Sequence, residues 1–131
     1  SKLAFDVSEK YVAAAESNLG VRLPESYREA MKKENGGRRK AASDLWSIIP
    51  IFDQTDRKRV SRTSNDIVRE TKAMSSWTGW PPSAICIAQN GSGDALLFLR
   101  EGAVCDGTVY LWRHETGRVE MIALDFAKLK A

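Results

Sequence analysis

The sequence is poor in the residues that metal and redox chemistry require. It holds two cysteines, Cys86 and Cys105, and one histidine, His114. The cysteines lack the CxxC spacing of a zinc site, and no second cysteine pair accompanies them. We therefore expect no metal or other cofactor. We expect buried thiols. Cys86 lies in an apolar run and should be inert, whereas Cys105 lies in the turn 102–107, where an exposed thiol is the alternative.

Long apolar runs are also absent. No stretch approaches the roughly 20 apolar residues needed to cross a bilayer, and residues 1–6 lack the apolar core of a signal peptide. These absences predict a cytoplasmic protein without membrane contacts. The 131 residues, 43% hydrophobic and 28% charged, predict one folded domain over 1–131. At this length a single core buries roughly two-thirds of the surface that the unfolded chain exposes.

The net charge of +3 is small but unevenly distributed. Residues 38–72 hold nine Lys and Arg against five Asp and Glu, whereas residues 84–125 hold three against six. A nucleic-acid binder combines cations with aromatic rings for stacking, and the basic window contains only Trp46 and Phe52. We therefore interpret the basic window as a solvated face and disfavour a nucleic-acid partner.

Helical patterns dominate the N-terminal part of the chain. Ser8 precedes a first helix with an apolar stripe, and Gly20 ends it. Leu-Pro-Glu at 23–25 opens a second helix, because proline suits the first helical turn. Asn-Gly-Gly at 35–37 ends that helix, which predicts a positive φ in at least one of the two glycines.

The segment after the second helix shows weaker patterns. Residues 38–47 are polar and basic and are expected to form an exposed loop, whereas 46–52, apolar but containing proline, suit an edge strand or an extended segment. A second basic run, Arg-Lys-Arg at 57–59, is also expected to lie in a loop. Ser-Asn-Asp at 64–66 then caps a third helix, which ends before the prolines at 81–82.

From residue 84 onward the apolar positions follow strand patterns. Asn-Gly-Ser-Gly-Asp at 90–94 joins two apolar runs into a hairpin, and two further strands follow it. The predicted strands cover 85–88, 95–99, 108–114 and 119–124. Asp125 can cap a short closing helix over 125–129. We predict an α+β domain, with N-terminal helices packed on a mainly antiparallel sheet of four to six strands and a short C-terminal helix.

Four motifs occur in order along the chain. They are Leu-Pro-x-x-Tyr at 23–27, Asn-Gly-Gly at 35–37, Gly-Ser-Gly-Asp at 91–94 and Val-Tyr-Leu-Trp-Arg-His-Glu at 109–115. Over about 7–129 this order resembles the SUKH superfamily, which includes fungal cell-wall-synthesis regulators of the Smi/Knr type and many bacterial immunity proteins. The resemblance implies an immunity protein (antitoxin), encoded beside a polymorphic toxin, that binds the toxin domain and silences it. It leaves open a regulatory scaffold of the fungal kind, which the compact chain disfavours.

The contact with such a toxin is expected in the acidic C-terminal part, because loops that project from a rigid sheet vary without disturbing a core. We predict exposed carboxylates and one aromatic anchor as contacts, namely Asp94, Asp106, Glu115, Glu101, Glu120 and either Trp112 or Tyr110. A place for Trp112 in the core is the favoured alternative to a contact role. The competing hypothesis is that the basic segment 38–72 meets an acidic toxin. The identity of the toxin stays open, and a monomer is favoured.

An enzymatic function finds little support in the sequence. Glu115 follows His114, but adjacent strand residues point to opposite faces, so this glutamate cannot orient the imidazole. Gly-Ser-Gly-Asp at 91–94 joins two strands, lacks the lysine of a phosphate-binding loop and ends in an anion. We therefore expect no catalytic residues and no phosphate site.

Overall fold

The structure of the protein is a computed structural model that describes residues 4–130. Its helices are α1 (Glu9–Leu19), α2 (Glu25–Lys33), α3 (Arg57–Arg62), α4 (Ile67–Met74) and the 3-10 helix η1 (Phe126–Lys128). Its strands are β1 (Arg38–Ala41), β2 (Asp44–Ile48), β3 (Ile85–Gln89), β4 (Ala95–Phe98), β5 (Arg100–Glu101), β6 (Val104–Cys105), β7 (Val109–Trp112) and β8 (Val119–Ala123).

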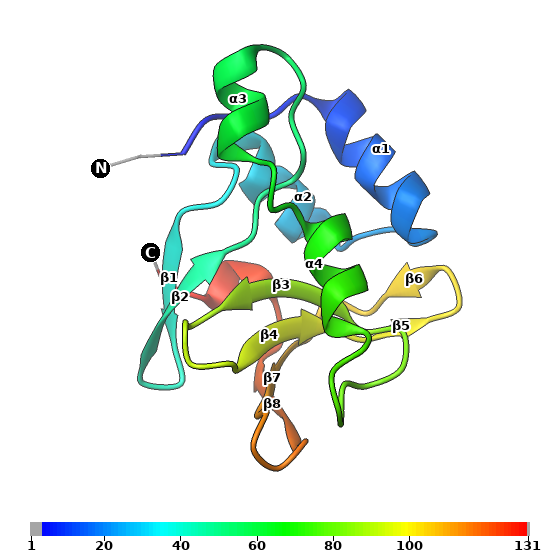
Figure 1. Ribbon diagram of the computed structural model, residues 1–131, viewed down its shortest axis with the longest axis vertical. Helices are drawn as coiled ribbons and strands as arrows, with labels where there is room; N and C mark the ends of the chain where they lie inside the picture. The colour runs from blue at the N-terminus through cyan, green and yellow to red at the C-terminus, as the bar shows by residue number, and fades with distance from the viewer. Residues whose placement is uncertain (1–3, 131) are drawn as a thin grey trace.

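Six of the strands form one antiparallel sheet in the order β1-β2-β3-β4-β7-β8, and β5 pairs with β6 in a small separate sheet. In Figure 1 the helices α1, α2 and α3 occupy the upper part of the molecule. Helix α4 packs against β3, and η1 packs against α2. The predicted α+β class, with N-terminal helices on an antiparallel sheet, is confirmed.

The first two helices begin and end where the sequence predicts. Ser8 has the extended backbone of an N-cap, although its side chain makes no capping hydrogen bond, and Gly20 ends α1 in the left-handed region. Helix α2 follows Pro24. Beyond its end, Gly36 and Gly37 both have positive φ, 119° and 81°. The predicted stop is therefore confirmed.

Residues 38–48 form a hairpin instead of the predicted exposed loop. Strands β1 and β2 pair from Arg38 and Ser47 to Ala41 and Asp44, around a turn formed by residues 42–43. Both turn residues, an alanine and a serine, have positive φ, 50° and 61°. Such a turn usually carries Asn-Gly, so Ala-Ser gives no hairpin signal in the sequence. Strand β2 is also not the predicted edge strand, because β1 and β3 flank it.

The basic run at 57–59 lies in helix α3 and not in the predicted loop. The carboxylate of Asp56 caps this helix by accepting the backbone N–H of Arg59 at 2.9 Å. No residue of α3 is buried, so the helix has no apolar stripe that a sequence pattern would reveal. Helix α4, by contrast, buries Ile67 and Met74 behind its cap Asp66, as predicted.

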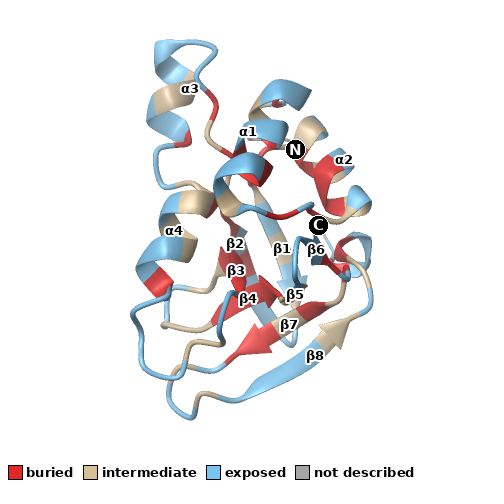
Figure 2. Ribbon diagram, turned by 90° about the vertical axis from the view of Figure 1, so that its right-hand side faces the viewer, coloured by how far each residue is buried: buried red, intermediate tan, exposed pale blue. Residues whose placement is uncertain are grey.

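Aromatic side chains from distant segments close the core. Tyr27 of α2 is fully buried, and its ring centroid lies 5.3 Å from that of Phe98 and 5.0 Å from that of Phe126, both edge-on. Trp112 of β7 is also fully buried, and its indole N–H donates to the carbonyl of Gly79 at 2.9 Å. Figure 2 shows the buried residues gathered in β3, β4 and β7, while β8 is mostly exposed.

The predicted C-terminal strands and closing helix are confirmed, and a short hairpin joins them. Asp125 caps η1 by accepting the backbone N–H of Ala127 at 2.8 Å. The extra hairpin, β5–β6, occupies the predicted turn 102–107 and exchanges backbone hydrogen bonds with Arg22 at 2.7 and 3.2 Å. These bonds hold β6 against the helical part of the molecule. Cys105 is consequently buried, as expected of both thiols, and the alternative of an exposed Cys105 does not hold.

Candidate protein-binding surfaces

The predicted acidic contact residues lie on two separate parts of the molecule. Glu101 and Asp106 lie in or directly after the β5–β6 hairpin, whereas Glu115 and Glu120 belong to the β7–β8 hairpin. Asp94 directly precedes β4 and contacts His114 at the end of β7. In Figure 1 the β5–β6 hairpin extends to the right, and the β7–β8 turn projects from the bottom. One partner would have to span both hairpins to reach all five carboxylates.

Asp94 is joined to His114 across the sheet. Its Oδ1 atom accepts the backbone N–H of His114 at 3.1 Å and lies 2.8 Å from the ring Nδ1. Gly93, with a φ of 99°, lies against the same ring, because a Cβ at this position would stand 2.9 Å from Nδ1. The Gly-Ser-Gly-Asp motif and the His-Glu end of the last motif therefore meet. Their contact holds the start of β4 against the end of β7.

The Asp94 carboxylate thus already has partners within the chain. Burial alone would raise its pKa, but the hydrogen bonds from His114 and the charge of Arg113, 3.7 Å away, outweigh burial and hold the pKa below its usual range. The side chain is only 15% exposed. A contact with a partner would compete with this arrangement.

Only one of the two predicted aromatic anchors reaches the surface. Trp112 has no exposed area, and the rings of Trp77 and Trp80 pack edge-on against it at 6.2 and 5.1 Å. Trp112 therefore belongs to the core, which is the alternative that the sequence favours. Its predicted role as a contact is wrong, because a fully covered indole offers a partner no surface. Tyr110, on the neighbouring position of β7, is half-buried.

Arginines accompany the carboxylates of the β7–β8 end. Arg113 lies 3.3 Å from Glu120, and Arg118 occupies the same turn as Glu115. Opposite charges in such proximity weaken the field that either sign produces at a distance. The exposed carboxylates, Glu101, Asp106, Glu115 and Glu120, stay predicted contacts for a basic partner.

A groove opens at the other end of the molecule, beside the N-terminal segment and α3. It has a volume of about 850 Å³ and lies between that segment, the end of α2, the β1–β2 pair and the end of α3. Ala4, Phe5 and Pro50 contribute apolar surface to it. Its lining also contains three exposed cations and one acid, which are Lys33, Arg38, Arg62 and Glu34.

The Asn-Gly-Gly motif forms one wall of this groove. The buried amide of Asn35 donates to the carbonyl of Ile51 and accepts its backbone N–H, both at 2.8 Å. These bonds tie the end of α2 to the chain that follows β2. A Cβ on Gly37 would stand 3.0 Å from the carboxylate of Glu34, so this carboxylate lies against the glycine. The motif therefore shapes the groove in addition to ending the helix.

The cations beside the groove differ in how they are neutralised. Arg59 lies 3.1 Å from Asp53, which is fully buried, and 2.9 Å from Asp6. Burial alone would raise the pKa of Asp53, but hydrogen bonds from Thr55 and Arg59 hold it below its usual range.

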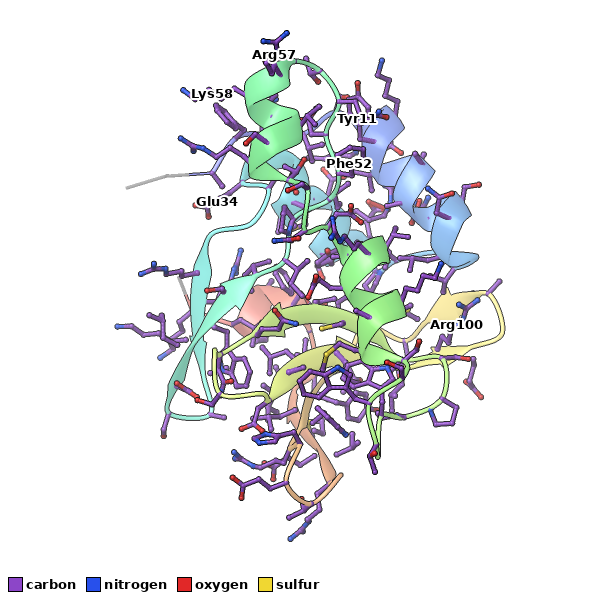
Figure 3. The ribbon with its side chains drawn as sticks, viewed as in Figure 1. Tyr11, Glu34, Phe52, Arg57, Lys58 and Arg100 are labelled. Carbon is purple, nitrogen blue, oxygen red and sulfur yellow. The ribbon has the colours of Figure 1, made fainter. Side chains whose placement is uncertain are left out.

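Five other cations in this region form no ion pair with any of residues 4–130, namely Lys33, Arg38, Arg57, Lys58 and Arg62. Figure 3 shows Arg57 and Lys58 projecting from α3, with Glu34 below Lys58 on the same side of the molecule. We call these five cations with the groove the basic groove region. Four of them lie in the basic window 38–72, whereas Lys33 precedes that window and is separated from the Asn-Gly-Gly motif only by Glu34.

The part of the chain that the structure describes contains no candidate metal site and no cysteine with a lowered pKa. No group of three or more His, Cys, Asp or Glu side chains within it is placed to hold a metal ion. Burial raises the pKa of the Cys86 thiol to about 12 and that of Cys105 to about 11. No helix over residues 4–130 has the length and apolar character to span a bilayer.

The chain belongs to the SMI1 / KNR4 family (SUKH-1), which a comparison with protein families matches over residues 6–130. The match covers all four sequence motifs and confirms the resemblance to the SUKH superfamily. No curated protein and no solved structure is significantly similar to the chain.

Proposed function

We propose that this protein is an immunity protein that neutralises a bacterial toxin domain by binding it directly, without catalysis, in the cytoplasm of the cell that makes both. The proposal rests on the family membership over residues 6–130 and on the structural roles of the four sequence motifs. Leu-Pro opens α2, Asn-Gly-Gly ties α2 to the sheet, and Gly-Ser-Gly-Asp meets His114. Each of these motifs supports the scaffold, so recognition is left to the exposed positions between them.

Stoichiometric binding suits this scaffold. A stable protein complex covers about 800 Å² on each partner, and a surface that is already ordered loses little conformational entropy on binding. The sheet and the helices that pack on it supply such a surface, and the groove and hairpin ends supply exposed charges. Occlusion of the toxin's active site or of its target-binding surface would then be enough to inhibit it.

A regulatory scaffold that binds signalling proteins is the second candidate, because the matching family is named for SMI1 and KNR4. The two candidates differ in how they bind. An immunity protein forms one tight, equimolar complex with its toxin, whereas a scaffold binds several partners more weakly.

The test is to co-express the chain with the variable C-terminal domain of a large secreted protein encoded beside it. We expect the cells to survive expression of that domain and the two proteins to purify as an equimolar complex. A folded chain that gives no protection and forms no complex would contradict the immunity function.

The variant His114→Ala tests the non-catalytic part of the proposal. The imidazole contacts Asp94 and Gly93, both of which belong to the scaffold, so we expect protection to persist as long as the variant is folded. Arg118→Gln, at an exposed position of the neighbouring turn, is the matched control. A folded His114→Ala variant that still binds the toxin but no longer protects cells would show that the protein acts chemically.

A further inference from the structure

We propose that the groove beside α3 binds an acidic polypeptide segment of the protein partner, whose carboxylates pair with Lys33, Arg38 and Arg62 while an apolar side chain packs on Phe5 and Pro50. The inference rests on the proposed function only in taking the toxin domain as that partner. Its starting point is the distribution of unpaired charge around the groove.

Helix α3 concentrates positive charge that the protein itself leaves mostly unneutralised. Four of its six residues are Lys or Arg, and its sequence contains no acid. Of these four cations only Arg59 forms ion pairs within residues 4–130, and Asp53 and Asp6 are among its partners. Like charges one helical turn apart repel each other, so a ligand that brings carboxylates relieves this repulsion as well as forming new ion pairs.

The position of Phe5 favours a polypeptide over a nucleic acid. The guanidinium groups of Arg59 and Arg62 lie 4.7 and 5.4 Å from the centroid of this ring, and the ammonium of Lys58 lies 5.7 Å from it. These cations lie over the faces of the ring, on which a base would have to stack, and stacking is how single strands are usually held. An aliphatic side chain needs no free ring face and can pack against the ring edge and Pro50.

Glu34 gives a second reason for the same choice. Its carboxylate lies against Gly37, inside the lining of the groove. A continuous chain of phosphates would meet this anion, whereas a polypeptide can place its carboxylates at the three cations and a neutral residue beside Glu34.

The edge of β1 limits how the segment can bind. Backbone hydrogen bonds of 2.7 and 3.3 Å join Lys40 to Lys130 on that edge. A partner strand therefore cannot extend the sheet along the whole of β1. Recognition in the groove is therefore expected to rely mainly on side chains, in particular on the three cations.

The first test measures binding of a short fluorescein-labelled peptide, rich in Glu and with a central Leu, by fluorescence anisotropy. We expect the double variant Arg38→Glu with Arg62→Glu to weaken binding about tenfold, because each exposed ion pair contributes modestly and reversal also adds repulsion. The control variant, Arg69→Glu with Lys72→Glu, makes the same change of net charge at exposed positions of α4 and is expected to change binding less than about twofold.

A third variant, Glu34→Gln, should change peptide binding in the opposite direction. Removing the only acid among the described residues that line the groove should tighten peptide binding about twofold. Circular dichroism and thermal melting confirm that each variant is folded. The proposal is overturned if the α4 control loses as much binding as the groove variant, or if Glu34→Gln weakens binding. It is also overturned if a single-stranded oligonucleotide of equal charge binds better than the peptide.

The second test uses the toxin domain itself and separates this inference from the proposed function. We expect the groove variant to bind the toxin more slowly and the acidic peptide to compete with the toxin. A groove variant that loses the peptide but binds the toxin normally removes the groove from the contact and leaves the immunity function intact. A protein that binds the peptide through the groove but fails to bind or neutralise the toxin contradicts the immunity function and not the groove.

Discussion

The basic groove region and the β7–β8 end differ in whether their charged side chains form ion pairs. At the β7–β8 end, Asp94 is paired with His114 and Arg113, and Glu120 is paired with Arg113. Beside the groove, Arg59 is paired with Asp53 and Asp6, whereas the five cations of the basic groove region have no acidic partner within residues 4–130. The basic window of the sequence contains four of these five cations but also the paired Arg59, so an excess of charge does not show which charges are free. Pairing does, and it favours the groove as the charged contact surface.

The two regions also differ in where their aromatic rings lie. Phe5 is half-buried beside the groove, whereas Trp112 lies wholly inside the core behind the β7–β8 end. A surface ring contributes to a contact only if part of it is exposed. The β7–β8 end is thus a rigid end of the scaffold, and the groove combines charge with accessible apolar area.

The largest effect is expected on the stability of the scaffold behind the β7–β8 end. Trp112→Ala should lower the free energy of unfolding by about 3–5 kcal/mol, because it empties a fully buried site and removes the hydrogen bond to Gly79. Tyr110→Ala, at the half-buried neighbour, should cost much less. Urea denaturation measures both. Similar costs for the two variants would mean that Trp112 is not the core residue described above.

Glycines in the two regions provide a finer comparison. Gly93→Ala should destabilise the fold by about 2 kcal/mol, because its positive φ is strained for alanine and its Cβ would also meet the His114 ring, which Asp94 holds in place. Gly37→Ala should cost about 1 kcal/mol, since its Cβ meets only the movable end of Glu34.

Gly91→Ala is the control for this pair of variants. Its φ is also positive, 85°, but a Cβ there would meet nothing within 4 Å, so the variant reports backbone strain alone. Thermal melting of the three variants gives their order. A Gly93→Ala variant no less stable than Gly91→Ala would show that the ring moves freely.

Acid stability distinguishes the paired carboxylate of the β7–β8 end. The pKa of Asp94 is lower in the folded protein than its ordinary value of 3.8, so its contribution is present above that pH and is lost as the pH falls through the folded pKa. Asp94→Asn should therefore cost roughly 1 kcal/mol at pH 7 and less at pH 3. Denaturation at both pH values measures this. A cost that does not shrink at pH 3 would mean that the charge of Asp94 contributes nothing.

The smallest expected effect concerns the carboxylates that stay exposed. Asp106→Lys with Glu115→Lys should change the affinity for the toxin by about 0–1 kcal/mol and act mainly on the association rate at low salt. Asp94 is left unchanged in this variant, because its loss would disturb the sheet. Stopped-flow association at two salt concentrations measures the effect. If this variant slows binding more than the groove variant does, the acidic ends of the two hairpins, and not the groove, are the main contact.

The sequence by itself determined the α+β class, the first two helices, the strands β3, β4, β7 and β8, and the family. These are the parts in which local chemistry is strong, such as Pro24 at a helix start, Gly20 at a helix end and the apolar run of β3. The β1–β2 hairpin and α3 were not predicted, because Ala42 and Ser43 form their turn without Asn-Gly and α3 buries nothing. Periodicity reports burial, so an element without a buried face leaves no pattern.

Only the tertiary structure decided which charges are free. Asp94 and His114 contact each other although they are twenty positions apart in the sequence. Asp53 forms an ion pair with Arg59, whereas Arg62, on the same helix, stays unpaired within residues 4–130. The groove likewise joins the N-terminal segment, the end of α2, the β1–β2 pair and the end of α3, which are separated along the chain. An ion pair depends on a distance of a few ångströms between atoms. The order of residues constrains that distance only for near neighbours, and for the rest it is set by how the helices pack on the sheet.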